Sequence, residues 1–128
     1  MKLKVEFSKN LFLILGAVLL GVIGQLSMKH GMSQVKIITS GVGELAASLS
    51  KALMQPFVTA GFLLYGISAL VWLMVLSRVE LSYAYPMVSI GYVAVVILSR
   101  ILFHEHVTGM RVLGIVVICA GVFLISRS

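Results

Sequence analysis

Residues 11–28 read LFLILGAVLLGVIGQLSM, eighteen positions without a charged side chain. An α-helix rises about 1.5 Å per residue, so about 20 apolar residues cross the hydrocarbon core of a bilayer. This stretch therefore predicts a membrane-spanning helix. It is too long for the apolar region of a signal peptide, and no clear small-residue cleavage site closes it, so we expect it to be retained.

Three further apolar runs of similar length follow, at about residues 56–76, 81–103 and 107–125. These runs are apolar on every face, whereas the strands of a β-barrel alternate. A helix also satisfies its own backbone hydrogen bonds in lipid. The sequence therefore predicts an all-α integral membrane protein with four transmembrane helices, forming a single membrane domain over residues 1–128.

The composition excludes two other classes of protein. Hydrophobic residues make up 60% of the chain and charged residues 11%, whereas about 25% of a soluble domain is charged, so a soluble enzyme is excluded. The net charge of +6 comes from basic residues scattered between the apolar runs. They form no basic face for a phosphate backbone, so we expect no nucleic-acid partner.

The basic residues do not fix the orientation in the membrane. Five fall on each side of the four spans: Lys2, Lys4, Lys9, Arg78 and Arg127 on one, and Lys29, Lys36, Lys51, Arg100 and Arg111 on the other. The positive-inside rule therefore leaves two alternatives open. The leader lysines place the N-terminus inside, or the chain inserts both ways and pairs antiparallel. Cysteine labelling from each side of the membrane distinguishes them.

The longest connection separates the first two spans and contains an apolar stripe. Leu45, Leu49 and Leu53 recur at four-residue spacing within it. This spacing predicts a short amphipathic helix lying at the membrane interface.

The chain offers no convincing metal or catalytic site. His104 and His106 flank Glu105 with no further ligand nearby in sequence. We expect Glu105 to be solvated or to pair with Arg100 or Arg111. No nucleophile–base set or phosphate-binding loop is visible, so we predict neither an enzyme nor a cofactor.

The fourth span carries the first family resemblance. Residues 113–122 read LGIVVICAGV and resemble the last helix of small multidrug resistance (SMR) transporters, within the drug/metabolite transporter superfamily. Gly114 and Gly121 stand two turns apart on one face, where small residues let helices approach closely. The resemblance implies that this face makes a dimer contact; packing within the chain is the alternative.

The first span resembles the SMR pattern, but this chain lacks the SMR residues that bind the transported cation. The embedded glutamate of SMR antiporters falls at Gly21, and the aromatic residue that they use against flat cations falls at Val88. The four acidic residues all lie outside the apolar runs. A buried carboxylate is the group that would bind a cation and exchange a proton, so a cation or small-metabolite exporter is kept only as an alternative.

Two motifs are more similar to the small paired flippase subunits of the aminoarabinose lipid A modification pathway. They are residues 82–93, SYAYPMVSIGYV, and residues 24–29, GQLSMK. This resemblance implies a flippase for a polyprenyl-phosphate-linked sugar such as aminoarabinose-phospho-undecaprenol. It also implies the bacterial inner membrane, and a homodimer or a heterodimer with a homologous subunit. A non-transporting subunit that stabilises a glycosyltransferase is a second alternative.

Five residues are candidates for contact with that substrate. Lys29 would hold the phosphate, although a lysine at a helix end also snorkels to the interface. Gln25 lies one turn earlier on the same face and would contact the sugar or another helix. Tyr85, Ser89 and Tyr92 are spaced as one helical stripe, which suits either a sugar or ordinary packing.

Other residues of the second and third spans have structural interpretations. Pro86 lies one turn into the third span and should bend it, since it removes a backbone hydrogen bond near Ser82. We assign Tyr65 and Tyr83 to packing, and Trp72 to packing or lipid contact.

Overall fold

The computed structural model describes the backbone of residues 2–128 and the side chains from Ser8 onward, and Met1 lies outside this part. The regular elements in that range are the helices α1 (Lys2–Met32), α2 (Val42–Met54), α3 (Pro56–Leu76), α4 (Leu81–Met87), α5 (Ser89–Phe103) and α6 (Gly109–Arg127). Four stretches are long and apolar enough to cross a membrane: Ser8–Met32, Pro56–Leu76, Leu81–Phe103 and Gly109–Arg127. The all-α, four-span prediction is confirmed, as is a short helix between the first two spans.

Two helix boundaries differ from the prediction. The first helix continues four residues past position 28, so Lys29 lies in the last turn of α1 rather than at its end. The last helix begins at Gly109 rather than residue 107, because the Thr108 hydroxyl accepts the backbone N–H of Arg111 at 3.3 Å as an N-cap. The first span is thus longer than hydropathy predicted, because α1 includes Lys29, and the last is shorter, because Thr108 caps α6 from outside the helix.

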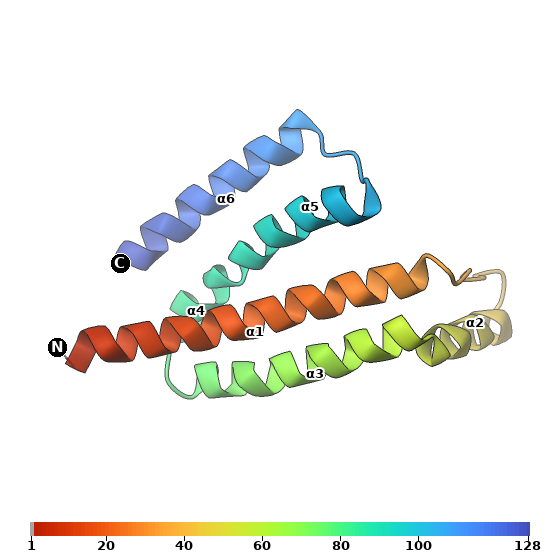
Figure 1. Ribbon diagram of the computed structural model, residues 1–128, viewed down its shortest axis with the longest axis horizontal. Helices are drawn as coiled ribbons and strands as arrows, with labels where there is room; N and C mark the ends of the chain where they lie inside the picture. Colours follow the sequence, from red (N-terminus) through yellow and green to blue (C-terminus); the bar gives the residue numbers. More distant parts are fainter. Residues whose placement is uncertain (1) are drawn as a thin grey trace.

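The pairing of α1 with α3 is the closest helix contact of the fold (Figure 1). A methyl group on Gly61 would lie 2.6 Å from the Gly24 carbonyl oxygen, and one on Gly24 would lie 2.8 Å from that of Gly61. Either distance is a clash with backbone, so both positions require glycine. Small residues of this kind let helices associate without a hydrophobic driving force.

Two hydroxyl groups bridge the same pair of helices on either side of the glycines. Ser68 Oγ on α3 donates to the carbonyl of Ala17 on α1 at 2.6 Å. Ser27 Oγ on α1 donates to the carbonyl of Phe57 on α3, also at 2.6 Å. These hydrogen bonds fix the two antiparallel helices in register.

The third span is divided at Val88, directly before α5. Pro86 lies inside α4, and the N–H of Val88 bonds to the carbonyl of Tyr85 at 3.1 Å with three-residue spacing. The N–H of Gly91 bonds in the same way to Val88 at 2.8 Å. The tighter turns interrupt the helix, so residues before and after Val88 do not follow one continuous face.

α5 packs on α1, whereas α6 stands on the outside. A methyl group on Gly91 would lie 2.8 Å from Val18 Cγ1. The backbone of α5 therefore packs directly against the Val18 side chain of α1. The small buried core around this contact consists of Ile14, Val18, Val22, Val75, Ala84 and Met87. No residue of α6 is buried, and Figure 1 shows it as the outermost helix beside α5.

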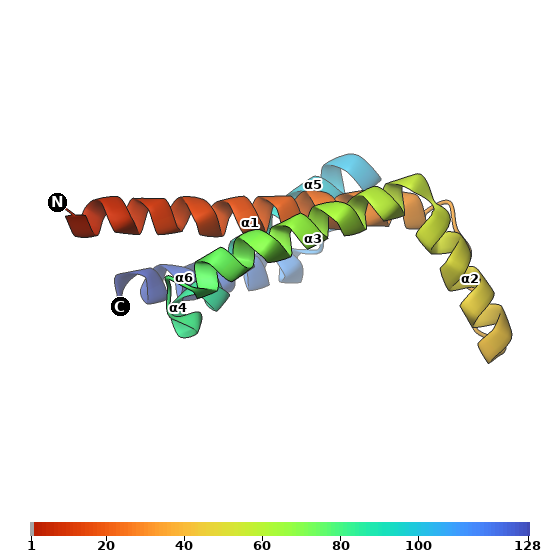
Figure 2. The same cartoon turned by 90° about the horizontal axis from the view of Figure 1, so that it is seen from below.

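α2 leaves the direction of the spans at the end where α3 begins (Figure 2). Its buried side is formed by small residues, and Ser48 Oγ accepts the N–H of Ile38 at 3.0 Å. Leu49 and Leu53 are about half exposed. The position of this helix at the membrane interface stays a prediction.

The Gly61 contact gives a direct test of the fold. Gly61→Val should lower the free energy of unfolding by about 3 kcal/mol, because the new side chain meets backbone atoms that cannot move aside. The measurement is thermal unfolding in detergent. Gly66→Val is the matched control on the same helix, since a Cβ there has nothing within 4 Å. Equal melting temperatures for the two variants would contradict the close packing.

Candidate functional site

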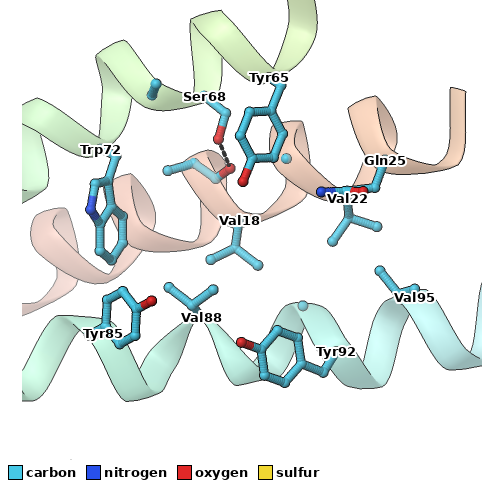
Figure 3. Close-up of a pocket in the computed structure, with 14 residues that line it drawn as sticks. Val18, Val22, Gln25, Tyr65, Ser68, Trp72, Tyr85, Val88, Tyr92 and Val95 are labelled. Atoms are coloured by element: carbon cyan, nitrogen blue, oxygen red, sulfur yellow. Dashed lines mark hydrogen bonds between the residues drawn. The ribbon is translucent and has the colours of Figure 1, made fainter. Parts of the chain in front are cut away.

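A cavity of about 360 Å³ opens between α1, α3 and the α4–α5 span. Aromatic side chains from three helices form much of its wall, and we call it the aromatic cavity (Figure 3). Its lining residues with polar atoms are Gln25, Tyr65, Ser68, Trp72, Tyr85 and Tyr92. The size falls within the range of ligand pockets, about 300–1,000 Å³.

The tyrosines give the aromatic cavity its chemistry. Figure 3 shows the hydroxyl groups of Tyr65, Tyr85 and Tyr92 directed into the space between the helices. The three side chains are 47%, 64% and 54% exposed, so the cavity is open to the outside of the chain. Phenol groups offer both a flat apolar ring and a hydrogen-bonding hydroxyl, which suits a ligand with polar edges and apolar faces.

Gly21 lies on the wall of this cavity. A methyl group there would lie 3.3 Å from Ser68 Oγ and 4.0 Å from the ring of Tyr65, so a longer side chain would enter the space between them. This is the position to which the SMR resemblance assigns the antiporter glutamate. Within the described part of the chain, the residues lining the cavity include no acid and no base. The cavity is therefore electrically neutral.

A second pocket of about 350 Å³ adjoins the aromatic cavity, and Gln25 and Val95 line both. We call it the basic pocket, because Lys29 and Arg111 line it together with Glu105. It lies where α1 and α5 end and α6 begins. The Lys29 ammonium is 3.8 Å from a carboxylate oxygen of Glu105. Gln25 thus connects the neutral aromatic cavity to the charged residues of the basic pocket.

The partner of Glu105 differs from the expectation. The carboxylate pairs with Lys29 across the bundle rather than with Arg100 or Arg111. His104 explains this, because it ends α5 in the left-handed conformation with φ of 54° and turns the chain back. In the part of the chain that the structure describes, no group of three histidine, cysteine or acidic residues could hold a metal.

The structure brings together four of the five candidate residues. Gln25, Tyr85 and Tyr92 line the aromatic cavity, and Lys29 lines the adjoining basic pocket. Ser89 lies elsewhere, in a mainly apolar groove between α5 and α6, and its hydroxyl donates to the carbonyl of Pro86 at 2.5 Å. The expected single stripe is wrong for Ser89, because the helix is interrupted at Val88 immediately before it.

Three cavity residues on α3 were not among the candidates. The sequence predicts packing for Tyr65 and packing or lipid contact for Trp72, and it singles out no role for Ser68, yet all three line the aromatic cavity. Their spacing of three and four places them on one helix face. This polar-tipped stripe of the second span is the sequence signal that indicates them, as Tyr85, Ser89 and Tyr92 form one in the third.

The glycine face of α6 lies open. A methyl group on Gly114 or on Gly121 would meet nothing within 4 Å. Packing of these glycines within the chain is therefore not seen among the described residues. The face is available to another chain.

Comparison with known proteins places this architecture in a family. The model of the EamA-like transporter family matches residues 13–127. The chain belongs to this family. EamA-like proteins are transporters of the drug/metabolite superfamily, so the resemblance to that superfamily is confirmed and an enzyme is excluded.

Three relatives of the EamA-like chain illustrate its similarity to flippase subunits. It is 31% identical over 118 residues to "Probable 4-amino-4-deoxy-L-arabinose-phosphoundecaprenol flippase subunit ArnE" of Pseudomonas fluorescens, covering 92% of this chain and 97% of the relative. The ArnE protein of Pseudomonas aeruginosa is 31% identical over 116 residues, covering 91% and 96%. The ArnF subunit of Serratia proteamaculans is 34% identical over 112 residues, covering 86% of each chain. No solved structure matches significantly.

The Lys29–Glu105 ion pair should contribute little to stability. Its side chains are 61% and 40% exposed. We expect Glu105→Gln to change the free energy of unfolding by less than about 1 kcal/mol, as is typical of exposed pairs. Thermal unfolding of Glu105→Gln, Lys29→Gln and the double variant checks this. A large, non-additive loss would mean that the pair holds the fold together.

Proposed function

We propose that this chain is a subunit of a flippase that moves a polyprenyl-phosphate-linked sugar, of the aminoarabinose-phospho-undecaprenol type, across the bacterial inner membrane. One observation carries the proposal: a neutral cavity lined by tyrosines and a glutamine adjoins a pocket that contains a lysine. The functions after which the ArnE and ArnF relatives are named support the same substrate class.

The aromatic cavity is suited to the sugar. A sugar ring has apolar C–H faces that stack on aromatic rings and hydroxyls that exchange hydrogen bonds with phenols and amides. Tyr85 and Tyr92 approach from one side of the cavity and Tyr65 from the other, with Gln25 beside them. In a hydrocarbon environment these groups replace the water that the sugar loses.

The basic pocket is suited to the phosphate. Lys29 supplies an ammonium group one helical turn from Gln25, so phosphate and sugar would occupy adjoining spaces. The polyprenyl tail needs no polar path, because it is soluble in the bilayer. The exposed side of the aromatic cavity leaves the tail in lipid while the headgroup crosses.

A second subunit would complete the path. Four helices enclose little space, and α6 presents Gly114 and Gly121 on an open face. The relatives are named as flippase subunits. We propose a dimer through α6, with a homologous subunit or a second copy supplying an inverted repeat. Rocking of the first three spans against this contact would expose the site to each side in turn.

A reconstituted flipping assay tests the substrate proposal. Lys29→Ala should slow transfer of undecaprenyl-phospho-aminoarabinose across liposomes by about tenfold or more, the effect of losing a charged hydrogen bond. Tyr85→Phe combined with Tyr92→Phe should also slow it, because two hydroxyls that replace water are removed. Tyr83→Phe is the control, since Tyr83 lines the groove beside α6 instead. Unchanged transfer by Lys29→Ala would refute the phosphate role.

Measurement of association tests the dimer contact. Gly114→Leu and Gly121→Leu should reduce dimer formation in nanodiscs several-fold while leaving the melting temperature of the monomer unchanged, because both glycines face open space. Gly66→Leu, at an equally open position on α3, is the control. If all three variants associate equally, the contact lies on another helix.

A further inference from the structure

Three charged side chains meet in the basic pocket, although they come from separate parts of the chain. Lys29 comes from α1, Glu105 from the α5–α6 connection and Arg111 from the first turn of α6. The proposed function assigns the phosphate to Lys29 alone. The pocket therefore contains a second cation and an anion that the proposed function has not yet used.

The carboxylate of Glu105 holds Lys29 loosely. Its oxygen is 3.8 Å from the ammonium nitrogen, beyond the 2.7–2.9 Å that is typical of a direct charged hydrogen bond. Both side chains are more than a third exposed, so water screens their attraction. A phosphate that accepts several hydrogen bonds at once can displace such a carboxylate.

The guanidinium group of Arg111 is held by one hydrogen bond and keeps further N–H donors for a ligand. One guanidinium nitrogen donates to the carbonyl of His106 at 3.1 Å. A guanidinium has five N–H donors, so the others stay available for an oxyanion. Its backbone N–H bonds to the Thr108 hydroxyl, which keeps Arg111 in the first turn of α6, where the helix dipole also favours a negative group.

We propose that Lys29 and Arg111 together bind the phosphate of the lipid-linked substrate, and that Glu105 pairs with Lys29 only until that phosphate binds. The proposal rests on the function proposed above and adds a second ligand and a built-in competitor. With Glu105 included, the three side chains carry one net positive charge. The phosphodiester group of a sugar-linked polyprenyl phosphate carries one negative charge, so it balances that net charge while Glu105, no longer paired with Lys29, still lines the pocket.

The exchange also links substrate binding to the arrangement of the helices. The Lys29–Glu105 pair connects α1 to the segment that carries α6. When the phosphate takes over Lys29, Glu105 is released, and the phosphate itself then bridges α1 and α6 through Lys29 and Arg111. Loading therefore replaces an internal connection between the α1–α3 pair and α6 by one that lasts only while substrate is bound.

Binding measurements in nanodiscs test the two-cation site with undecaprenyl-phospho-aminoarabinose as the probe. Arg111→Ala should raise the Kd by about tenfold, and Arg111→Lys by less, since lysine keeps the charge but not the fork of donors. Glu105→Gln should lower the Kd several-fold because it removes the competitor. The controls are Arg100→Ala and Glu80→Gln, the same charge changes at residues that do not line the pocket, and each should alter the Kd by less than about twofold.

The outcomes separate this proposal from the proposed function. Equal Kd values for Arg111→Ala and Arg100→Ala, with intact binding and flipping by the unmodified protein, would overturn the two-cation site and leave the flippase proposal standing. Phosphatidylglycerol and inorganic phosphate serve as further probes. If either binds as tightly as the lipid-linked sugar and with the same dependence on Arg111, the two-cation site stands and the substrate assignment fails. A lower melting temperature of Arg111→Ala with an unchanged Kd would assign Arg111 a structural role and overturn the site.

Discussion

The contact between Gly24 and Gly61 is the constraint on which the rest of the structure depends. Lipid tails are as apolar as leucine side chains, so two membrane helices gain little by burying apolar surface against each other. The glycines let the backbones of α1 and α3 meet, and the Ser68 and Ser27 hydroxyls fix their register. Neighbouring positions then follow: Gln25 comes directly after one glycine, and Tyr65 lies one turn after the other. The aromatic cavity is thus positioned by the closest helix contact in the chain.

The two sides of this site are built differently. The α1–α3 side is held by backbone contact and hydrogen bonds across the helices. The other side is a span interrupted at Val88, followed by a helix with no buried residue. A transporter needs both a fixed reference and elements that change position around it. The distribution of contacts assigns the first role to α1 and α3 and leaves α6 to be completed by another chain.

Hydropathy alone predicted the four spans, because length and apolar composition are what a bilayer requires of a helix. Spacing also placed Gln25 and Lys29 on one face. It failed for Ser89, since the interruption at Val88 depends on a local change of backbone hydrogen bonding that composition does not reveal. It also missed the Lys29–Glu105 pair, which depends on the left-handed conformation of His104. Tyr65 and Trp72 were missed for a different reason: a single aromatic residue in an apolar helix has the same sequence pattern whether it faces lipid or a cavity, and only the stripe that the two form with Ser68 distinguishes them.

Trp72 is the single tryptophan of the chain, and it stands on the wall of the aromatic cavity. Indole emission depends on the polarity and hydrogen bonding of its surroundings. The protein therefore carries its own optical reporter at the place where a headgroup would enter. The wavelength and lifetime of the Trp72 emission therefore depend on whether the cavity holds water, hydrocarbon or sugar. No fluorescent label has to be introduced into the cavity.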